Sequence, residues 1–565
     1  DIVIYKLDRR RGINRMTKSI LKKSVAIFSA VAVIFSCCFV TSFAAENVAK
    51  VGDTEYPTLA KAINAAEDNA TIELLSDATI GKTQLKKSLT FNLNGYTITG
   101  NEDASYVFSP WAVDTVFNNG IIKMTNTNPG SQAIQVVGGN LTLNDIEIDI
   151  AEPNASSDYN YGVKAFASVD ANDDKIINDP VKVVVNNSRI YEVSNSNIPE
   201  AMTAGVIVIG KNNNDAVSND MDNRDAVLEI NNSEINVSGF AVSGNGAAHG
   251  TKIDINNSEL TSTVASAIYH PQVGDMNIFG GTITGVTGIE VRAGNVNVSE
   301  ATNIVATGDP TTVDPNGNGT TTTGAAVAIA QHTTKLPINV TIENATLVGA
   351  SALVANNPEK NPEEAIANIK IDIQNGQFSG LVKTNGGGAI QASGGTFDKL
   401  DSSVEVVADE VAEITDQDGF VTTVVGLSNI NNALTNASEG TVVTMVKAYE
   451  GLELKVPAGI KVSNDSGNNI VVNDAELAQG ETVTVTEPTE PTEPVNPDNP
   501  QDNPSTDKPA TGDQNQTTGD KTDADKVADS DSPKTGDDTM VLGYVIMMLA
   551  ALGIGGTLVV NRKKN

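Results

Sequence analysis

Apolar residues alternate with polar residues in short runs along most of the chain. Runs such as Leu228/Ile230 and Ile253/Ile255 each end at an asparagine-rich turn, and the sequence INNSE occurs at 230–234 and again at 255–259. Alternation with a period of two that stops at Asn, Gly or Asp predicts a strand, a turn and a second strand. The pattern therefore predicts many short strands between residues 90 and 400.

A further apolar run precedes each of these pairs, for example Val206/Val208 and Ile289/Val291. One unit therefore consists of three short strands, and no helix separates one unit from the next. Such repeats favour an all-β solenoid, a parallel β-helix in which each coil stacks about 4.8 Å from the last. We assign this domain to residues 46–424, with a small β-rich repeat or cap domain at 425–486.

The asparagines of the turns have two expected roles. Asparagine adopts the left-handed backbone region that a sharp turn requires, at low cost. Its amide can also donate to and accept from the equivalent asparagine of the next coil. We therefore expect a ladder of asparagine side chains along one corner of the solenoid.

Insertions into the repeat fall between the first and second strands of a coil, at 169–180, 211–225 and 356–368. The histidines lie in or beside the same position, so we expect these segments to share one edge and to form a candidate binding edge. The candidate residues of this edge are His249, His270, His332, Asp215 and Asp222.

The two ends of the chain resemble targeting signals. Lys18, Lys22 and Lys23 precede an apolar run and small residues, which is typical of a secretory signal peptide cleaved after Ala44 or Ala45. We assign residues 1–45 to an upstream segment and this signal peptide. An N-terminal membrane anchor is the alternative.

At the other end, a Pro/Thr/Asp-rich segment at 487–531 cannot bury a core and is expected to be a disordered stalk that spans the cell wall. Residues 532–565 follow, with an apolar span at 540–560 that is long enough for a transmembrane helix, and a basic tail. This order resembles the sorting signal that sortase joins to peptidoglycan in Gram-positive bacteria, although serine replaces the usual leucine. The motif residues are Ser532, Pro533, Lys534, Thr535 and Gly536.

By this resemblance, sortase cleaves after Thr535 and attaches the chain to the cell wall, and the apolar span holds it in the membrane until then. A plain single-span membrane protein is the alternative. The body also resembles a family, through EYPTLAKAINAAEDNATIELLSDATI and LTFNLNGYTITG. These stretches are similar to the opening of Firmicutes surface proteins with a pectate-lyase-like, right-handed parallel β-helix. The resemblance implies a short helix around Leu59 and Ile63 that caps the coil stack, and a related opening recurs at 426–462.

Composition narrows the possible partners and cofactors. A formal net charge of −33 repels nucleic acids and anionic membranes, so we expect no nucleic-acid partner. Both cysteines, Cys37 and Cys38, lie in the signal segment, so no disulfide framework is expected in the body. Calcium is the one cofactor that the spacing of oxygen ligands suggests, although solvated acidic loops explain the same pattern. The candidate ligands are Asp170, Asn172, Asp174, Asp314, Asn316 and Asn318.

The pectate-lyase-like superfamily contains lyases, hydrolases and adhesins without catalysis, so the fold does not decide the activity. The Gly-His-Gly and Arg-x-Lys motifs of polygalacturonases are absent: Ala248 precedes His249, and Ala293 and Gly294 follow Arg292. No sequence motif pairs Arg292 with acids, and we assign no catalytic residue.

We expect a secreted, peptidoglycan-anchored adhesin that binds a glycan or a host protein. A polysaccharide lyase or glycoside hydrolase is the first alternative, and a passive surface spacer is the second.

Overall fold

A computed structural model describes residues 47–167, 180–193, 201–210, 224–245, 250–310 and 319–487. All of them belong to the first of the two units into which the chain divides, residues 1–489. The predicted signal peptide, stalk, sorting signal and apolar span lie outside the described residues, as do His249, Asp215, Asp222 and the candidate calcium ligands. No helix within the described ranges is long and apolar enough to cross a membrane.

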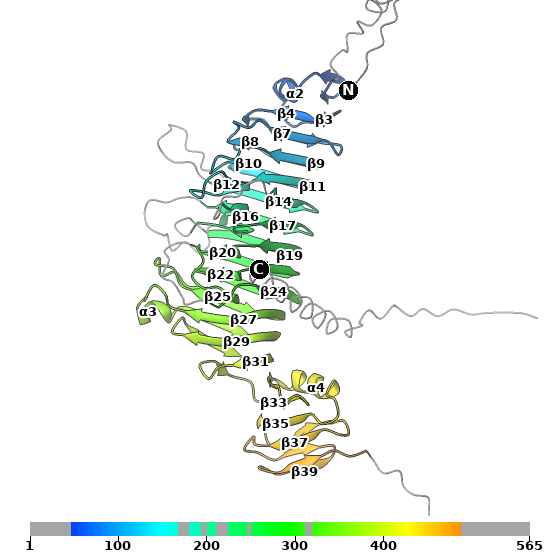
Figure 1. Ribbon diagram of the computed structural model, residues 1–565, viewed down its shortest axis with the longest axis vertical. Coiled ribbons are helices and arrows are strands. Elements are labelled where there is room, and N and C mark those ends of the chain that lie inside the picture. The colour runs from blue at the N-terminus through cyan, green and yellow to red at the C-terminus, as the bar shows by residue number, and fades with distance from the viewer. Residues whose placement is uncertain are drawn as a thin grey trace, which may run out of the picture. The chain divides into compact units, whose positions relative to one another are not determined.

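The described residues form mostly strands, and the strands stack in parallel (Figure 1). Three stacks, which we name A, B and C, receive one strand each from every coil. Six long strands bend at a turn and contribute to two stacks: β9 (Thr115–Met124), β11 (Gly139–Ala151), β19 (Gly250–Ser262), β21 (Gly274–Gly285), β27 (Ala345–Asn356) and β29 (Gln377–Asn385).

Stack A contains the second parts of β27 and β29 together with β5 (Thr83–Leu85), β8 (Tyr106–Pro110), β10 (Gln132–Val137), β12 (Asn160–Phe166), β15 (Thr203–Ile209), β18 (Val242–Ser243), β20 (Ser266–His270), β22 (Thr287–Val291) and β25 (Ala325–Ala330).

Stack B contains the first parts of β9, β11, β19 and β21 together with β3 (Ala70–Leu74), β6 (Leu89–Asn92), β13 (Val181–Asn186), β16 (Arg224–Asn231), β23 (Gly294–Ser299), β26 (Ile338–Ile342), β28 (Ile369–Ile373), β30 (Ala389–Ala392) and β32 (Glu405–Val406).

Stack C contains the second parts of β9, β11, β19 and β21 and the first parts of β27 and β29, together with β4 (Ala78–Ile80), β7 (Thr97–Gly100), β14 (Arg189–Val193), β17 (Glu234–Val237), β24 (Thr302–Ala306) and β31 (Gly395–Leu400).

The coils stack in sequence register, which confirms the predicted parallel-strand solenoid with three strands per coil. Ile230 lies opposite Ile255, and Ile255 lies opposite Ile278. All three side chains are fully buried in one continuous core, because every second residue of a strand points to the same face. The two INNSE copies are therefore the same corner of adjacent coils.

The two asparagines of INNSE divide the two expected roles between them. The second asparagine takes the left-handed conformation, with φ of 48° at Asn232 and 44° at Asn257. The first asparagine belongs to a ladder of Nδ2-to-Oδ1 hydrogen bonds of 2.7–2.9 Å. This ladder runs through Asn92, Asn118, Asn144, Asn186, Asn231 and Asn256.

The predicted N-terminal helix is α2 (Leu59–Ala65), and it follows an antiparallel hairpin of β1 (Ala49–Val51) and β2 (Thr54–Tyr56). Thr58 caps it by accepting a hydrogen bond from the backbone N–H of Lys61. Leu59 and Ala62 are buried in the main core, and α2 lies at the N-terminal end of the coils (Figure 1).

A second core follows the last coil and contains Ala412, Val424 and Val443. It is built from β33 (Val411–Thr415), β34 (Val421–Val425), α4 (Leu427–Thr435), β35 (Val442–Lys447), β36 (Leu452–Leu454), β37 (Lys461–Asn464), β38 (Ile470–Val472), β39 (Ala475–Leu477) and β40 (Thr482–Thr484). Its order is a hairpin, a helix and then parallel strands, the same order in which the N-terminal part begins. The repeated opening at 426–462 is thus also a repeat in structure.

Candidate functional site

Long connections border one stack of the solenoid. Turns between B and C strands are short in every described coil, and one or two residues with positive φ make most of them. The long connections instead join stack A to its neighbours on both sides. They comprise residues 167–180, 210–223 and 357–368 on the A-to-B side, and 152–159, 194–202 and 307–324 on the C-to-A side.

The insertions recognised in the sequence are those of the A-to-B side. The sequence pattern did not identify the C-to-A connections as insertions, because they contain no histidine and blur the repeat, although three candidate calcium ligands lie within 307–324. Stack A is therefore the stack best placed for binding, since binding residues concentrate on loops that a rigid scaffold positions.

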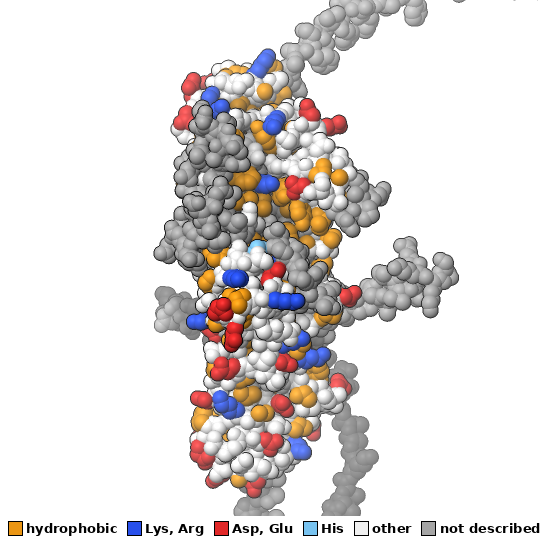
Figure 2. Space-filling model, turned by 90° about the vertical axis from the view of Figure 1, so that its left-hand side faces the viewer, with side chains coloured by type: hydrophobic (Ala, Val, Ile, Leu, Met, Phe, Trp, Pro, Cys, Tyr) orange, Lys and Arg blue, Asp and Glu red, His pale blue; other side chains and the backbone are white. Residues whose placement is uncertain are grey.

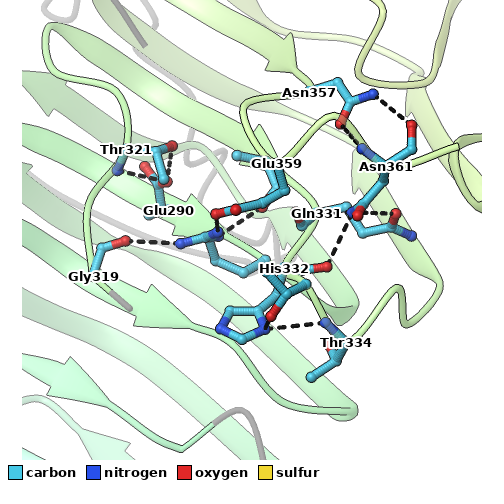
Figure 3. A network of polar contacts seen from close by, with 12 residues as sticks. Glu290, Gly319, Thr321, Gln331, His332, Thr334, Asn357, Glu359 and Asn361 are labelled. Carbon is cyan, nitrogen blue, oxygen red and sulfur yellow. Dashed lines mark hydrogen bonds and ion pairs between the residues drawn. The ribbon is translucent and has the colours of Figure 1, made fainter. Parts of the chain in front are cut away.

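A polar cluster is buried on the outer side of stack A at β22 (Figure 3). Ile289 and Val291 of this strand face the core, whereas Glu290 and Arg292 point to the opposite side. Both charged side chains are nevertheless completely buried. A buried charge is costly unless it is paired and hydrogen-bonded, so the partners of these two residues matter.

Arg292 binds groups from three separate segments. Its Nε donates to the carbonyl oxygen of Ala330 at 2.7 Å, and its Nη1 donates to that of Gly319 at 3.1 Å. Its Nη2 pairs with Oε1 of Glu359 at 2.8 Å, and the Glu359 side chain is 9% exposed. The guanidinium, which follows β22, thus contacts the end of β25, the segment before β25 and the connection after β27.

Glu290 is held by the segment before β25. Its Oε1 accepts hydrogen bonds from the backbone N–H of Thr321 at 3.0 Å and from the Thr321 hydroxyl at 2.5 Å. Burial raises the pKa of the Glu290 carboxyl to about 7, while the Thr321 hydrogen bonds and the Arg292 charge act in the opposite direction. A carboxyl group with such a pKa exchanges its proton near neutral pH.

The structure does not place His270 or His332, the two described histidines, on an exposed edge. His270 is completely buried at the end of β20, in register with Val291, and neither ring nitrogen has a hydrogen-bond partner within the described residues. Burial lowers the pKa of the His270 imidazole to about 4, and only the charge of Asp275 opposes this. His270 is therefore a neutral interior residue in this conformation.

His332 lies two residues after the end of β25 and is 9% exposed. Its Nδ1 accepts a hydrogen bond from the backbone N–H of Thr334 at 3.2 Å. The connection after β27 packs beside it, because Asn361 donates to the carbonyl oxygen of His332 at 3.1 Å and to Oε1 of Gln331 at 3.0 Å. His332 lies near the buried cluster, as Figure 3 shows.

Aromatic rings also line up along stack A. The ring centroids of Tyr159 and Phe240 are 5.8 Å apart, and those of Phe240 and Tyr269 are 5.2 Å apart. Tyr161 lies 6.1 Å from Tyr159, and the ammonium group of Lys164 lies 4.5 Å from the Tyr161 ring. The Phe240 and Tyr269 rings are stacked, the other two pairs are tilted, and all four rings are half-buried or buried.

Within the described ranges, no three His, Cys, Asp or Glu side chains come together in a way that could hold a metal ion. The candidate calcium ligands are not among these residues. No protein-family model, curated protein or solved structure matches this chain.

The ion pair of Arg292 with Glu359 and its electrostatic contact with Glu290 were not visible in the sequence. Glu359 lies 67 residues from Arg292 along the chain, and Glu290 is two residues away but hidden in an apolar strand pattern. The one usable signal was a charged residue at the outward position of a stack A strand. The cluster can neutralise a buried guanidinium, hold a proton near neutral pH and join two long connections.

Proposed function

We propose that the chain is a secreted protein, anchored to the Gram-positive cell wall, that binds a glycan or a host protein. The solenoid is then a right-handed parallel β-helix of the pectate-lyase-like kind. The observation that carries the binding proposal is the position of the long connections, which border stack A on both sides and leave the B–C corner with short turns. A passive spacer has no need to concentrate its insertions around one stack.

The location rests on the sequence. A signal peptide ending at Ala44 or Ala45 would export the chain, and sortase would join Thr535 to peptidoglycan after cleavage before Gly536. The stalk at 487–531 would then carry the solenoid through the wall, and the apolar span at 540–560 would act in the membrane only before sorting.

The surface supports a neutral or mixed-charge ligand. Figure 2 shows the side of the molecule on which α3 (Glu363–Ile366) lies, and acidic and basic side chains are interspersed among its described residues. The net charge of −33 disfavours nucleic acids and anionic membranes.

The experiment is a glycan and host-protein array probed with residues 46–487, which contain all the described elements. Saturable binding to a defined set of ligands is expected. Saturable binding to a ligand that the protein does not cleave supports the proposal. An array on which no ligand is bound saturably favours the passive spacer.

A second candidate function is polysaccharide cleavage, and the Glu290, Arg292 and Glu359 cluster favours it. A raised carboxyl pKa beside a cation and a second acid is a combination found in active sites. All three side chains are buried here, so catalysis would require the site to open. Incubation with pectin, other uronate polymers and mucin tests this, because release of reducing or unsaturated ends that disappears in Glu290→Gln would establish catalysis.

Calcium remains a proposal for the two acidic loops. Ions bound at Asp170, Asn172 and Asp174 or at Asp314, Asn316 and Asn318 would neutralise charge in connections that border stack A. Titration calorimetry with calcium at millimolar concentration tests it, and the absence of heat would remove calcium from the account.

A further inference from the structure

Two of the connections that border stack A meet each other above β22. Residues 319–322 come from the C-to-A side and residues 356–361 from the A-to-B side. The amide of Asn356 donates to the hydroxyl of Thr322 at 3.3 Å. Together the two segments lie over the outer side of the strand that carries Glu290 and Arg292, as the contacts in Figure 3 show.

Glu290 and Arg292 bind the two segments through different contacts. Glu290 holds residues 319–322 through Thr321. Arg292 contacts the first segment at Gly319, but it contacts the second segment through the Glu359 carboxylate. Glu359 lies in a tight turn, in which Lys360 adopts a left-handed φ of 53°. The side-chain amide of Asn357 closes this turn, because it donates a hydrogen bond to the carbonyl oxygen of Asn361 and accepts one from its backbone N–H.

We propose that residues 319–322 and 356–361 form a two-part cover over the outer side of stack A, and that the Arg292–Glu359 ion pair is the latch that keeps it closed. When the latch opens, Arg292 and Glu290 become accessible from outside. The proposal does not depend on which ligand the protein binds, nor on whether it is an enzyme.

The energetics favour a latch over ordinary surface packing. The guanidinium is fully buried and its Nη2 pairs with Glu359 at 2.8 Å, so loss of that carboxylate removes neutralising charge in a place from which water is excluded. The closed state is therefore sensitive to one carboxylate. Asn356 is the last residue of β27, where it pairs with Ala330 and accepts a hydrogen bond from Asn385. Residues 357–361 are held to the neighbouring segment by neutral hydrogen bonds from Asn361 to Gln331 and His332, each of which is weaker than the ion pair.

The test is amide hydrogen exchange, followed by mass spectrometry, on the purified full-length protein and on Glu359→Gln. The matched control is Glu363→Gln, which removes an exposed acid of the same connection, four residues further on. In Glu359→Gln we expect exchange to rise at least tenfold in peptides from 319–324 and 356–368, with no change in peptides from β23 and β26. Glu363→Gln should exchange like the parent.

Two results would overturn the proposal. Unchanged exchange in both segments of Glu359→Gln would show that other contacts hold the cover. A rise that extends equally to β23 and β26 would show that the ion pair stabilises the whole solenoid and does not act as a local latch.

Discussion

Individual residues in this solenoid have separable tasks, and the INNSE corner shows this most clearly. Asn231 and Asn232 are adjacent and chemically identical. One bonds its neighbours in the ladder, and the other supplies the left-handed turn. A substitution at each position should therefore have a different and predictable effect on the free energy of unfolding.

At Asn232, with φ of 48°, the backbone decides the outcome. Asn232→Gly should be neutral or slightly stabilising, because glycine takes this conformation freely. Asn232→Val should destabilise by about 1–2 kcal/mol, because a β-branched residue is strained there. Urea unfolding of both variants measures this, and equal stabilities would contradict the role assigned to the turn.

Glu290 should make stability depend on pH in an unusual direction. Its folded pKa of about 7 lies above its ordinary value of 4.5, so the folded state binds the proton more tightly between these values. The stability that Glu290 contributes is therefore present at acidic pH and is lost as the pH rises towards 7. His270, with its pKa lowered to about 4, acts with the opposite sign between 4 and its ordinary 6.5.

The difference between Glu290→Gln and the parent isolates the carboxyl group, because His270 titrates in both. The stability of the variant relative to the parent should increase by up to roughly 3 kcal/mol between about pH 4 and about pH 8. Urea unfolding at several pH values gives this difference. A difference that does not change with pH would mean that Glu290 titrates normally.

Among the structural elements, the asparagine ladder acts across coils and not within one. Asn186 donates to Asn144 and accepts from Asn231, at 2.9 Å in both cases. Asn186→Ala removes both bonds and leaves two half-buried amide groups without these partners, which should cost about 1–3 kcal/mol. Asn236→Ala, at an exposed position of β17, is the matched control and should stay within about 0.5 kcal/mol of the parent. Urea midpoints that fall equally in both variants would argue against the ladder.

The sequence was sufficient for the strands, the turns and the ladder, because stacking in register repeats the same residue types at the same place. Val206, Ile230 and Ile235 were assigned to the first, second and third strands of one coil, and they lie in β15, β16 and β17. The buried cluster could not be found in this way. Whether His270 faces inwards, and whether Glu359 reaches Arg292, depends on how single coils depart from the repeat.

At the scale of the whole molecule, the architecture that we expect follows from the two segments that begin at β1 and β33 and from the predicted signals at 1–45 and 532–565. Each opening consists of a hairpin, a helix and parallel strands, so the same order of elements occurs twice in the chain. The terminal signals predict that the mature protein is joined covalently to the wall through Thr535.

Expression in a Gram-positive host checks the attachment. The parent chain should be released from the wall only by enzymes that digest peptidoglycan, and its last residue should be Thr535. Pro533→Ala should shift the protein to the membrane fraction, because it removes a residue of the sorting motif. A parent chain found only in the membrane fraction would support the single-span alternative.

The central claim is that binding occurs along stack A between its long connections. Its most direct test is the dissociation constant for a ligand from the array, measured for the parent, for a variant in which a short Gly-Ser turn replaces 357–368, and for a matched variant with alanine at Thr261, Thr282 and Thr284 on the outer side of stack C. We predict that the loop variant weakens binding at least tenfold and that the stack C variant does not. Equal affinity for all three, or a loss confined to stack C, would contradict the account.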